Sequence, residues 1–281
     1  ASVNPYITIL GPMESAAKRM SIMGICNKLA WPVSPIFLAY VIGKNTDDTV
    51  ISDLFLPFYI IIGVFLLLGV ISLLAPLPEV KAAGEDEEED TKDSGKSILD
   101  FPHLLLGALA LFFYVGVETV ALGTLVDYAS WLSLPNASSY ALISPIGMVV
   151  GYICGILFIP KYISQSKALI ICSILGIVGS LLVVFTPANI SIWFIAIVAL
   201  GCSLMWPALW PLAISDLGKF TKTGSSFLVM AIAGGAVIPV IYGFMKDVVG
   251  AQNSYWIAPP LFIYILYYGL KGHKIRKNRA K

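Results

Sequence analysis

The stretch LFLPFYIIIGVFLLLGVISLLAP, from Leu54 to Pro76, contains no charged residue. It is long enough to cross the hydrocarbon core of a bilayer, which is about 30 Å thick and takes about 20 apolar residues as a helix. Only helices and closed barrels satisfy their backbone hydrogen bonds within lipid, and barrel strands alternate apolar and polar residues. Because this stretch is continuously apolar, we predict a membrane-spanning helix.

Similar stretches recur along the chain of 281 residues, which is 58% hydrophobic and only 12% charged, with a mean hydropathy of +0.85. A soluble domain carries about twice that share of charged residues. We therefore predict an all-α, polytopic membrane protein in which residues 1–10 form the end of one helix. Eight full spans are expected at residues 20–43, 54–76, 101–126, 138–160, 167–186, 190–215, 222–245 and 254–271.

Lysine and arginine are confined almost entirely to alternate connections between these spans. Of the 18 basic residues, Lys44 and Lys246 fall on the opposite side, and Lys28 lies within a span. Because cytoplasmic loops carry the excess of basic residues, we expect the first connection, the polar stretch after Pro76 and the C-terminal tail to be cytoplasmic.

One long polar stretch, residues 77–100, divides the chain unevenly, with six spans after it and only two and a part before it. Its acidic run from Glu85 to Asp90 predicts a solvated, flexible linker, with a regulatory docking role as the alternative. Many transporters consist of two six-helix halves joined by a cytoplasmic loop. We therefore expect residues 1–76 to be the remnant of an N-terminal bundle, 101–271 a C-terminal bundle and 272–281 a basic tail.

Glu118, Asn27 and Lys28 lie within predicted spans, and each needs a reason because strongly polar groups are costly in hydrocarbon. Glu118, in FFYVGVETVALG, either faces a central cavity, where it could transfer a proton or accept hydrogen bonds from sugar hydroxyls, or bonds to a neighbouring helix. Asn27 is too short to reach the interface, which favours a role in the cavity. The longer Lys28 side chain can snorkel to the interface or face the cavity, and its role is undecided.

Aromatic residues within the predicted spans give a second indication of where a substrate could bind. Trp206 and Trp210, in MWPALWP, lie four residues apart and therefore share one face of a helix. Membrane tryptophans often mark the interface, but two of them near the middle of a span, beside helix-breaking prolines, favour a platform for the apolar face of a sugar. Tyr114, in the same segment as Glu118, is a further candidate for contact with substrate.

Motifs of enzymes and of ATP-driven pumps are missing from the sequence. It contains no HExxH, GxSxG or Walker segment, and its two histidines, His103 and His273, fall near the ends of predicted spans. We therefore expect a protein that is not an enzyme and that has no catalytic residue, cofactor, metal site or nucleic-acid partner.

Four segments together resemble one family: NPYITILGP (Asn4–Pro12), the segment around Asn27, FFYVGVET (Phe112–Thr119) and KTGSSFLVMAIAGGAVIPVIYGFMKD (Lys222–Asp247). This is the fucose–galactose–glucose:proton symporter family, a branch of the major facilitator superfamily, and the likeness is nearest to bacterial glucose/galactose transporters. It covers nearly the whole chain. The resemblance implies a twelve-helix fold in which residues 1–10 end the fourth helix, so that this chain would be a fragment without helices 1–3.

The resemblance also implies a function. The family consists of secondary active transporters that move hexoses such as glucose, galactose or fucose by alternating access. The resemblance therefore implies a monomer in the bacterial inner membrane, coupled to protons or sodium.

The resemblance further suggests site residues. It matches Asn27 to an asparagine of the fifth helix and Trp206 to an aromatic position of the tenth. Fucose-type relatives carry an amide at the position of Glu118, which favours sugar contact over proton coupling there, and they do not share Lys28. Two alternatives remain: a transporter of another solute class, as in drug efflux, and a non-transporting sugar sensor.

Overall fold

The computed structural model describes residues 3–42, 50–75 and 97–275. All regular secondary structure within these ranges is helical, as the continuously apolar stretches predict. Most of the predicted linker, residues 77–100, and the end of the predicted tail, residues 272–281, lie outside the described residues, and their interpretation stays a prediction.

The described helices follow the predicted spans closely. The predicted helix end at residues 1–10 contains α1, and each of the eight predicted spans contains one long helix or two helices in succession. The helices are α1 (Val3–Ile9), α2 (Ala16–Ile42), α3 (Phe55–Leu74), α4 (Pro102–Gly123), α5 (Leu125–Trp131), α6 (Ile143–Phe158), α7 (Gln165–Phe185), α8 (Ala188–Ser203), α9 (Met205–Ile214), α10 (Thr221–Ala231), α11 (Gly234–Val249), α12 (Ala251–Ser254) and α13 (Ala258–Leu270).

Six helical segments of the described chain are long and apolar enough to cross a membrane by length and composition. The predicted spans at residues 20–43 and 254–271 are helical, as α2 and α13, but are not among these six. The six segments are Ile51–Leu74, Pro102–Gly123, Ala137–Phe158, Gln165–Phe185, Ala188–Ile214 and Gly218–Val249.

The chain divides into two compact units, residues 26–80 and residues 1–25 with 81–281. The smaller unit holds the greater part of α2 and all of α3, whose apolar side chains are exposed along nearly the whole helix. A helix that is apolar on every face belongs in lipid or in a larger core. The predicted division into an N-terminal bundle, residues 1–76, and a C-terminal bundle, residues 101–271, stays a prediction.

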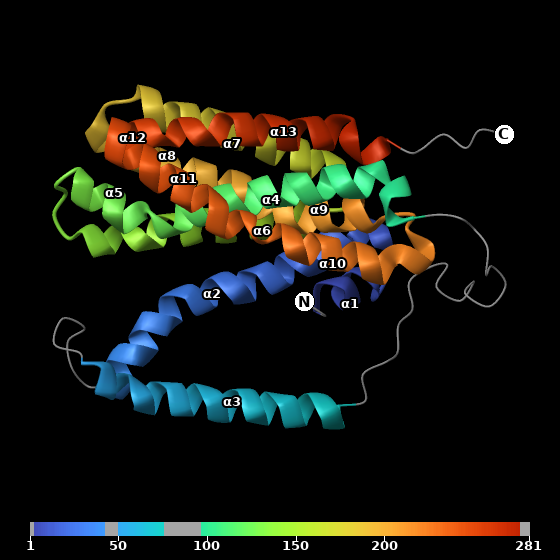
Figure 1. Ribbon diagram of the computed structural model, residues 1–281, viewed down its shortest axis with the longest axis horizontal. Coiled ribbons are helices and arrows are strands. Elements are labelled where there is room, and N and C mark those ends of the chain that lie inside the picture. Colours follow the sequence, from blue (N-terminus) through green and yellow to red (C-terminus); the bar gives the residue numbers. More distant parts are fainter. Residues whose placement is uncertain (1–2, 43–49, 76–96, 276–281) are drawn as a thin grey trace. The chain divides into compact units, whose positions relative to one another are not determined.

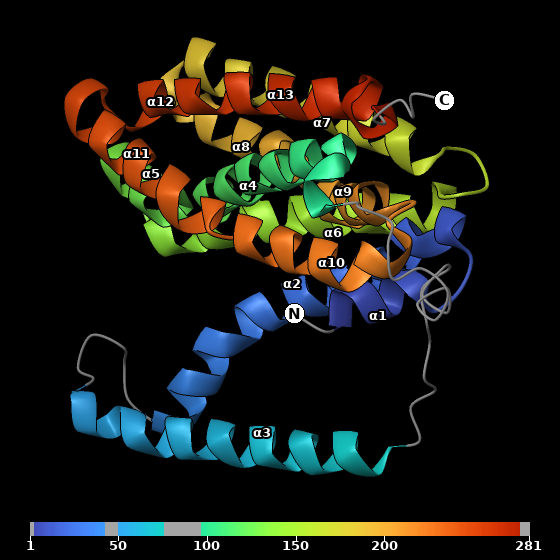
Figure 2. The same ribbon diagram turned by 45° about the vertical axis from the view of Figure 1, so that its right-hand side comes forward.

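In the larger unit, α4 packs against α9, α11 and α13 (Figures 1 and 2). Its approach to α11 requires glycine on both helices. A Cβ atom at Gly234 would lie 1.9 Å from the backbone oxygen of Phe112, and one at Gly116 would lie 2.2 Å from Cγ1 of Ile238. Small residues allow membrane helices to pack closely, and here they fix α4, the helix that carries Tyr114 and Glu118.

The span at residues 188–214 is broken where its prolines predict a break. Pro207 has no backbone N–H, and a proline ring collides with the carbonyl group four residues earlier in a helix, which here belongs to Ser203. Accordingly α8 ends at Ser203 and α9 begins at Met205. Pro211 then lies inside α9. The break separates the helix that carries both tryptophans from α8.

Candidate functional site

The candidate site is built on α4 and α9 of the larger unit. Tyr114 and Glu118 lie four residues apart on α4 and therefore project from the same face. The Tyr114 side chain is buried, whereas Glu118 is half-buried. The Tyr114 ring lies against Trp206 of α9, with ring centroids 6.3 Å apart. Two of the predicted residues are thus in direct contact across the helix pair.

The two tryptophans of α9 lie against each other, as their spacing predicts. Their ring centroids are 5.3 Å apart and their planes are inclined by 32°. Trp206 is partly exposed, while Trp210 is fully buried. The Nε1 atom of Trp210 has no hydrogen-bond partner within the described chain. A buried N–H group without a partner costs free energy, so this group is a donor that can receive a polar group of a ligand or a water molecule.

Tyr152 of α6 is a further member of the site that sequence reasoning missed. Its side chain is buried, and the Glu118 carboxylate lies near enough to interact electrostatically with both Tyr152 and Tyr114. A Cβ atom at Gly24 of α2 would lie 2.6 Å from the Tyr152 ring, so a glycine is needed where the two meet. Its only signal in the sequence was a tyrosine in the middle of a predicted span that also contains Tyr140.

Asn27 and Lys28 lie on α2, in the smaller unit, whereas α4 and α9 belong to the larger unit. Neighbouring residues of an α-helix project about 100° apart. Asn27 and Lys28 therefore point in different directions, and Asn27 is exposed whereas Lys28 is buried. The structure brings together Tyr114, Glu118, Trp206 and Trp210, and it leaves the roles of Asn27 and Lys28 as predictions.

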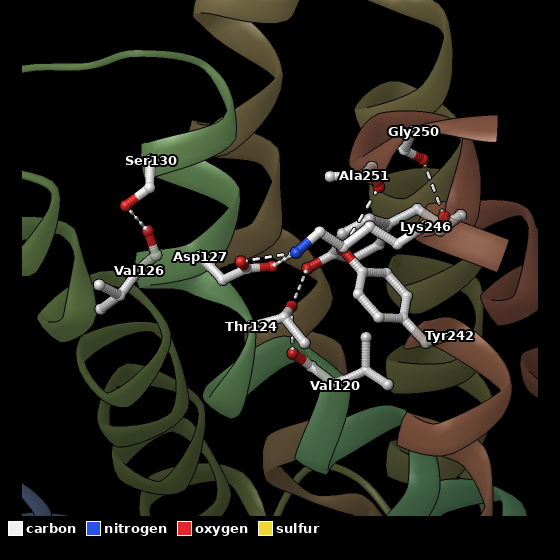
Figure 3. Close-up of polar contacts among 11 residues, drawn as sticks. Val120, Thr124, Val126, Asp127, Ser130, Tyr242, Lys246, Gly250 and Ala251 are labelled. Carbon is white, nitrogen blue, oxygen red and sulfur yellow. Dashed lines mark hydrogen bonds and ion pairs between the residues drawn. The ribbon is translucent and has the colours of Figure 1, made fainter. Parts of the chain in front are cut away.

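An ion pair lies elsewhere in the larger unit, where α5 meets α11 (Figure 3). Lys246 Nζ donates to both carboxylate oxygens of Asp127, at 2.6 and 2.5 Å, and the two side chains are 27% and 50% exposed. Beside it, the Thr124 and Tyr255 hydroxyls are 3.3 Å apart. This cluster joins helix ends and is separate from the aromatic site.

No group of three or more His, Cys, Asp or Glu side chains that could hold a metal ion occurs among the described residues. The candidate site consists of aromatic rings, one carboxylate and one indole N–H without a hydrogen-bond partner in the described chain. This combination offers flat apolar faces together with hydrogen-bonding groups of both kinds.

Comparison with known proteins identifies the family. The pattern of the Major Facilitator Superfamily matches residues 2–239. The glucose/galactose transporter of Brucella abortus is 32% identical over 282 residues, which cover 97% of this chain and 68% of the relative. The putative glucose/galactose transporter of Helicobacter pylori is also 32% identical, with 98% and 70% covered. The L-fucose-proton symporter of Escherichia coli is 22% identical, with 95% and 66% covered.

Solved structures agree on the fold. A crystal structure of the Escherichia coli fucose:proton symporter FucP has a TM-score of 0.80 and 22% identity, and the match covers 96% of this chain and 72% of that one. A structure of FucP in the outward conformation has a TM-score of 0.81 at the same identity. The chain belongs to the major facilitator superfamily, in the branch that contains the glucose/galactose transporters and the L-fucose-proton symporters.

Proposed function

We propose that the protein is a secondary active transporter that moves a hexose across a bacterial inner membrane by alternating access. Glucose and galactose are the favoured substrates. Coupling to protons is favoured by the name of the fucose-proton symporters among its relatives, with sodium as the alternative. The superfamily is one of transporters and not a class of enzymes. The proposal rests on the residues of the aromatic site and on the relatives' names together.

The observation that carries the proposal is the arrangement of Tyr114, Trp206 and Trp210 around one face of α9, with Glu118 one turn along α4. A hexose has apolar C–H faces that pack on aromatic rings, and hydroxyl groups that need hydrogen-bond partners when they leave water. The Glu118 carboxylate can accept from such hydroxyls, and the unpaired Nε1 of buried Trp210 can donate to one. The few polar groups of a small-molecule site fix orientation in this way.

Within the proposal, Asn27 supplies an amide from the N-terminal helices, and Lys28 either snorkels to the interface or faces the same cavity. Glu118 is foremost a sugar contact and secondarily a candidate for proton coupling. The distribution of Lys and Arg supports a cytoplasmic position for the linker and for the C-terminal tail. Each of these assignments goes beyond the family membership and is open to direct test.

Hexose uptake by the full-length protein tests these assignments. In cells that lack other hexose transporters, Glu118→Ala and Asn27→Ala are expected to abolish uptake of labelled glucose and galactose. Removal of the charged hydrogen-bond partner Glu118 costs about 1.5–3 kcal/mol, and leaving a sugar hydroxyl without its neutral partner Asn27 costs about 1–3 kcal/mol, so each loss is about fivefold at the least and about a hundredfold at the most. Normal uptake by either variant, at an amount of protein in the membrane equal to that of the wild type, would refute the assignment of that residue.

The variant Glu118→Gln separates the two roles of this side chain. An amide oxygen still accepts hydrogen bonds, so a pure sugar contact predicts that both exchange of labelled for unlabelled sugar and accumulation against a gradient continue. A role in proton coupling predicts that exchange continues while accumulation against a gradient is lost. Loss of both activities in the glutamine variant would support a requirement for the charge itself.

A further inference from the structure

The larger unit contains a cavity of about 320 Å³ that is separate from the aromatic site. It lies between α6, α7 and α8 at the end where α6 leads into α7, because its walls include Phe158, Ile163 and Ala168. From Ala168 it extends along α7 to Leu175, which is about 10 Å at 1.5 Å per residue. The volume is within the range of small-molecule binding sites.

The cavity offers hydrocarbon and almost no hydrogen-bonding groups. Its remaining walls are formed by side chains such as Ile171, Leu200 and Leu204, with two thiols, Cys154 and Cys172. The hydroxyl of Ser203, which also lines it, donates to the backbone oxygen of Leu200 at 2.6 Å and is already satisfied. Phe158 and Ile171 are 43% and 48% exposed, so the cavity opens at the surface. A sugar would find no partners here, whereas an alkyl chain would fit the chemistry.

Two lysines lie close in sequence to residues that line this cavity: Lys161 is two residues before Ile163, and Lys167 is next to Ala168. Lys161 lies in the connection between α6 and α7, and Lys167 lies in the first turn of α7. Both are exposed, and neither forms an ion pair within the described residues. Lys161 lies over the Tyr162 ring, 5.1 Å from its centroid. The stretch between Asp127 and Asp216 contains no acidic residue, and Lys161 and Lys167 are the only charged residues within that stretch.

One acidic residue from another part of the fold approaches this end. The side chain of Gln165 donates a hydrogen bond to the backbone oxygen of Met13, which brings the loop with exposed Glu14 near the start of α7. The start of α7 itself is favourable for an anion, because the helix dipole is positive at this end. The positive charge beside an apolar cavity is thus complementary to an amphiphile with a negative head group.

We propose that this cavity binds one acyl chain of an anionic phospholipid from the bilayer, with the lipid phosphate held by Lys161 and Lys167. The apolar walls next to two lysines that form no ion pair within the described residues favour an anionic lipid over a neutral one. Because the site shares no residue with the aromatic site, the proposal does not depend on which solute the protein transports. An ordered lipid here would brace α6 against α7 and α8.

The test uses the full-length protein in detergent with phosphatidylglycerol that carries a photoreactive group on one acyl chain. After illumination, mass spectrometry locates the label, which is expected on peptides of α6, α7 and α8 around the cavity. Ile171→Trp, which places an indole at the mouth, should reduce this labelling about tenfold or more. Ile174→Trp is the matched control, because Ile174 is equally exposed on α7 at 47% but does not line the cavity.

The head group is tested separately. Each basic residue near an anionic lipid contributes about a fivefold factor to binding, so Lys161→Gln with Lys167→Gln should weaken labelling by phosphatidylglycerol about twenty-fivefold. The exposed pair Lys271→Gln with Lys274→Gln makes the same change in net charge elsewhere and should leave labelling unchanged. Both lysine pairs lie on exposed positions, so these variants keep the test valid even if Ile171→Trp fails to fold.

Three outcomes would overturn the proposal. The first is labelling of α6–α8 that neither the tryptophan variant nor the lysine pair reduces. The second is equal labelling by photoreactive phosphatidylcholine, which would show that the phosphate and lysines confer no preference for an anionic lipid. The third is label that maps only to other helices.

Discussion

Substitution of one glycine at the crossing of α4 and α11 gives a quantitative test of the packing that holds the candidate site. In Gly234→Ala, the new Cβ atom would lie 1.9 Å from the backbone oxygen of Phe112. Because the obstacle is backbone and not the end of a flexible side chain, the two helices must separate. Overpacking of this kind costs about 1–3 kcal/mol, and we expect the upper half of that range.

The matched control is Gly243→Ala on the same helix, where a Cβ atom would meet nothing within 4 Å. Alanine is favoured over glycine inside a helix by up to about 1 kcal/mol, so this variant should be as stable as the wild type or slightly more so. The expected difference between the two variants is therefore about 3 kcal/mol. Displacement of α4 should also lower hexose transport, because α4 carries Tyr114 and Glu118.

Thermal unfolding of the full-length protein in detergent, followed by intrinsic fluorescence at a fixed heating rate, measures this difference as a change in apparent Tm. The structure predicts a clearly lower Tm for Gly234→Ala than for Gly243→Ala. If the two variants unfold at the same temperature, the close approach of α4 and α11 is wrong.

Further substitutions test two contacts outside the aromatic site. Asp127→Asn and Lys246→Gln should each lower the free energy of unfolding by no more than about 1 kcal/mol, because the ion pair is partly exposed and screened. Exchanging the two charges in one double variant should restore most of this loss. A larger effect of either single variant in the same unfolding assay would contradict the prediction. Arg19→Ala should cost about 1.5–3 kcal/mol, because the Arg19 side chain donates to the backbone oxygens of Ile7 and Thr8 at the end of α1. Arg19→Lys should recover only part of the lost stability, since lysine lacks the planar fork of donors. Equal stability of the alanine variant and the wild type would argue against a stabilising role for the hydrogen bonds from Arg19 to the end of α1.

The helical fold could be predicted from sequence because lipid leaves the backbone few options. Continuous apolar stretches predicted helices over every described span. Pro207 also indicated a break, and the reason is local: Ser203, four residues earlier, loses its helical partner. Other boundaries escaped prediction. Residues 101–126 were expected to form one span, but α4 ends at Gly123 and a separate short helix, α5, follows.

The candidate site could be predicted only where its members lie close in the sequence. The stacking of Trp206 on Trp210 follows from their spacing on one helix. The contact of Trp206 with Tyr114 depends on how α4 packs against α9, which no local pattern specifies. Tyr152 was missed for the same reason, since its nearness to Glu118 arises from the packing of α6. Periodicity predicts elements, whereas a site formed by several helices depends on their tertiary arrangement.

Hexose counterflow in liposomes that contain the purified full-length protein tests the central claim most directly. Labelled galactose outside should enter in exchange for unlabelled glucose or galactose inside, and drug-like solutes inside should not support exchange. Trp206→Ala should reduce the initial rate about tenfold or more, while Trp193→Ala, an exposed tryptophan of α8, should leave it unchanged. Absence of counterflow with every hexose, or an unchanged rate in Trp206→Ala, would contradict the account.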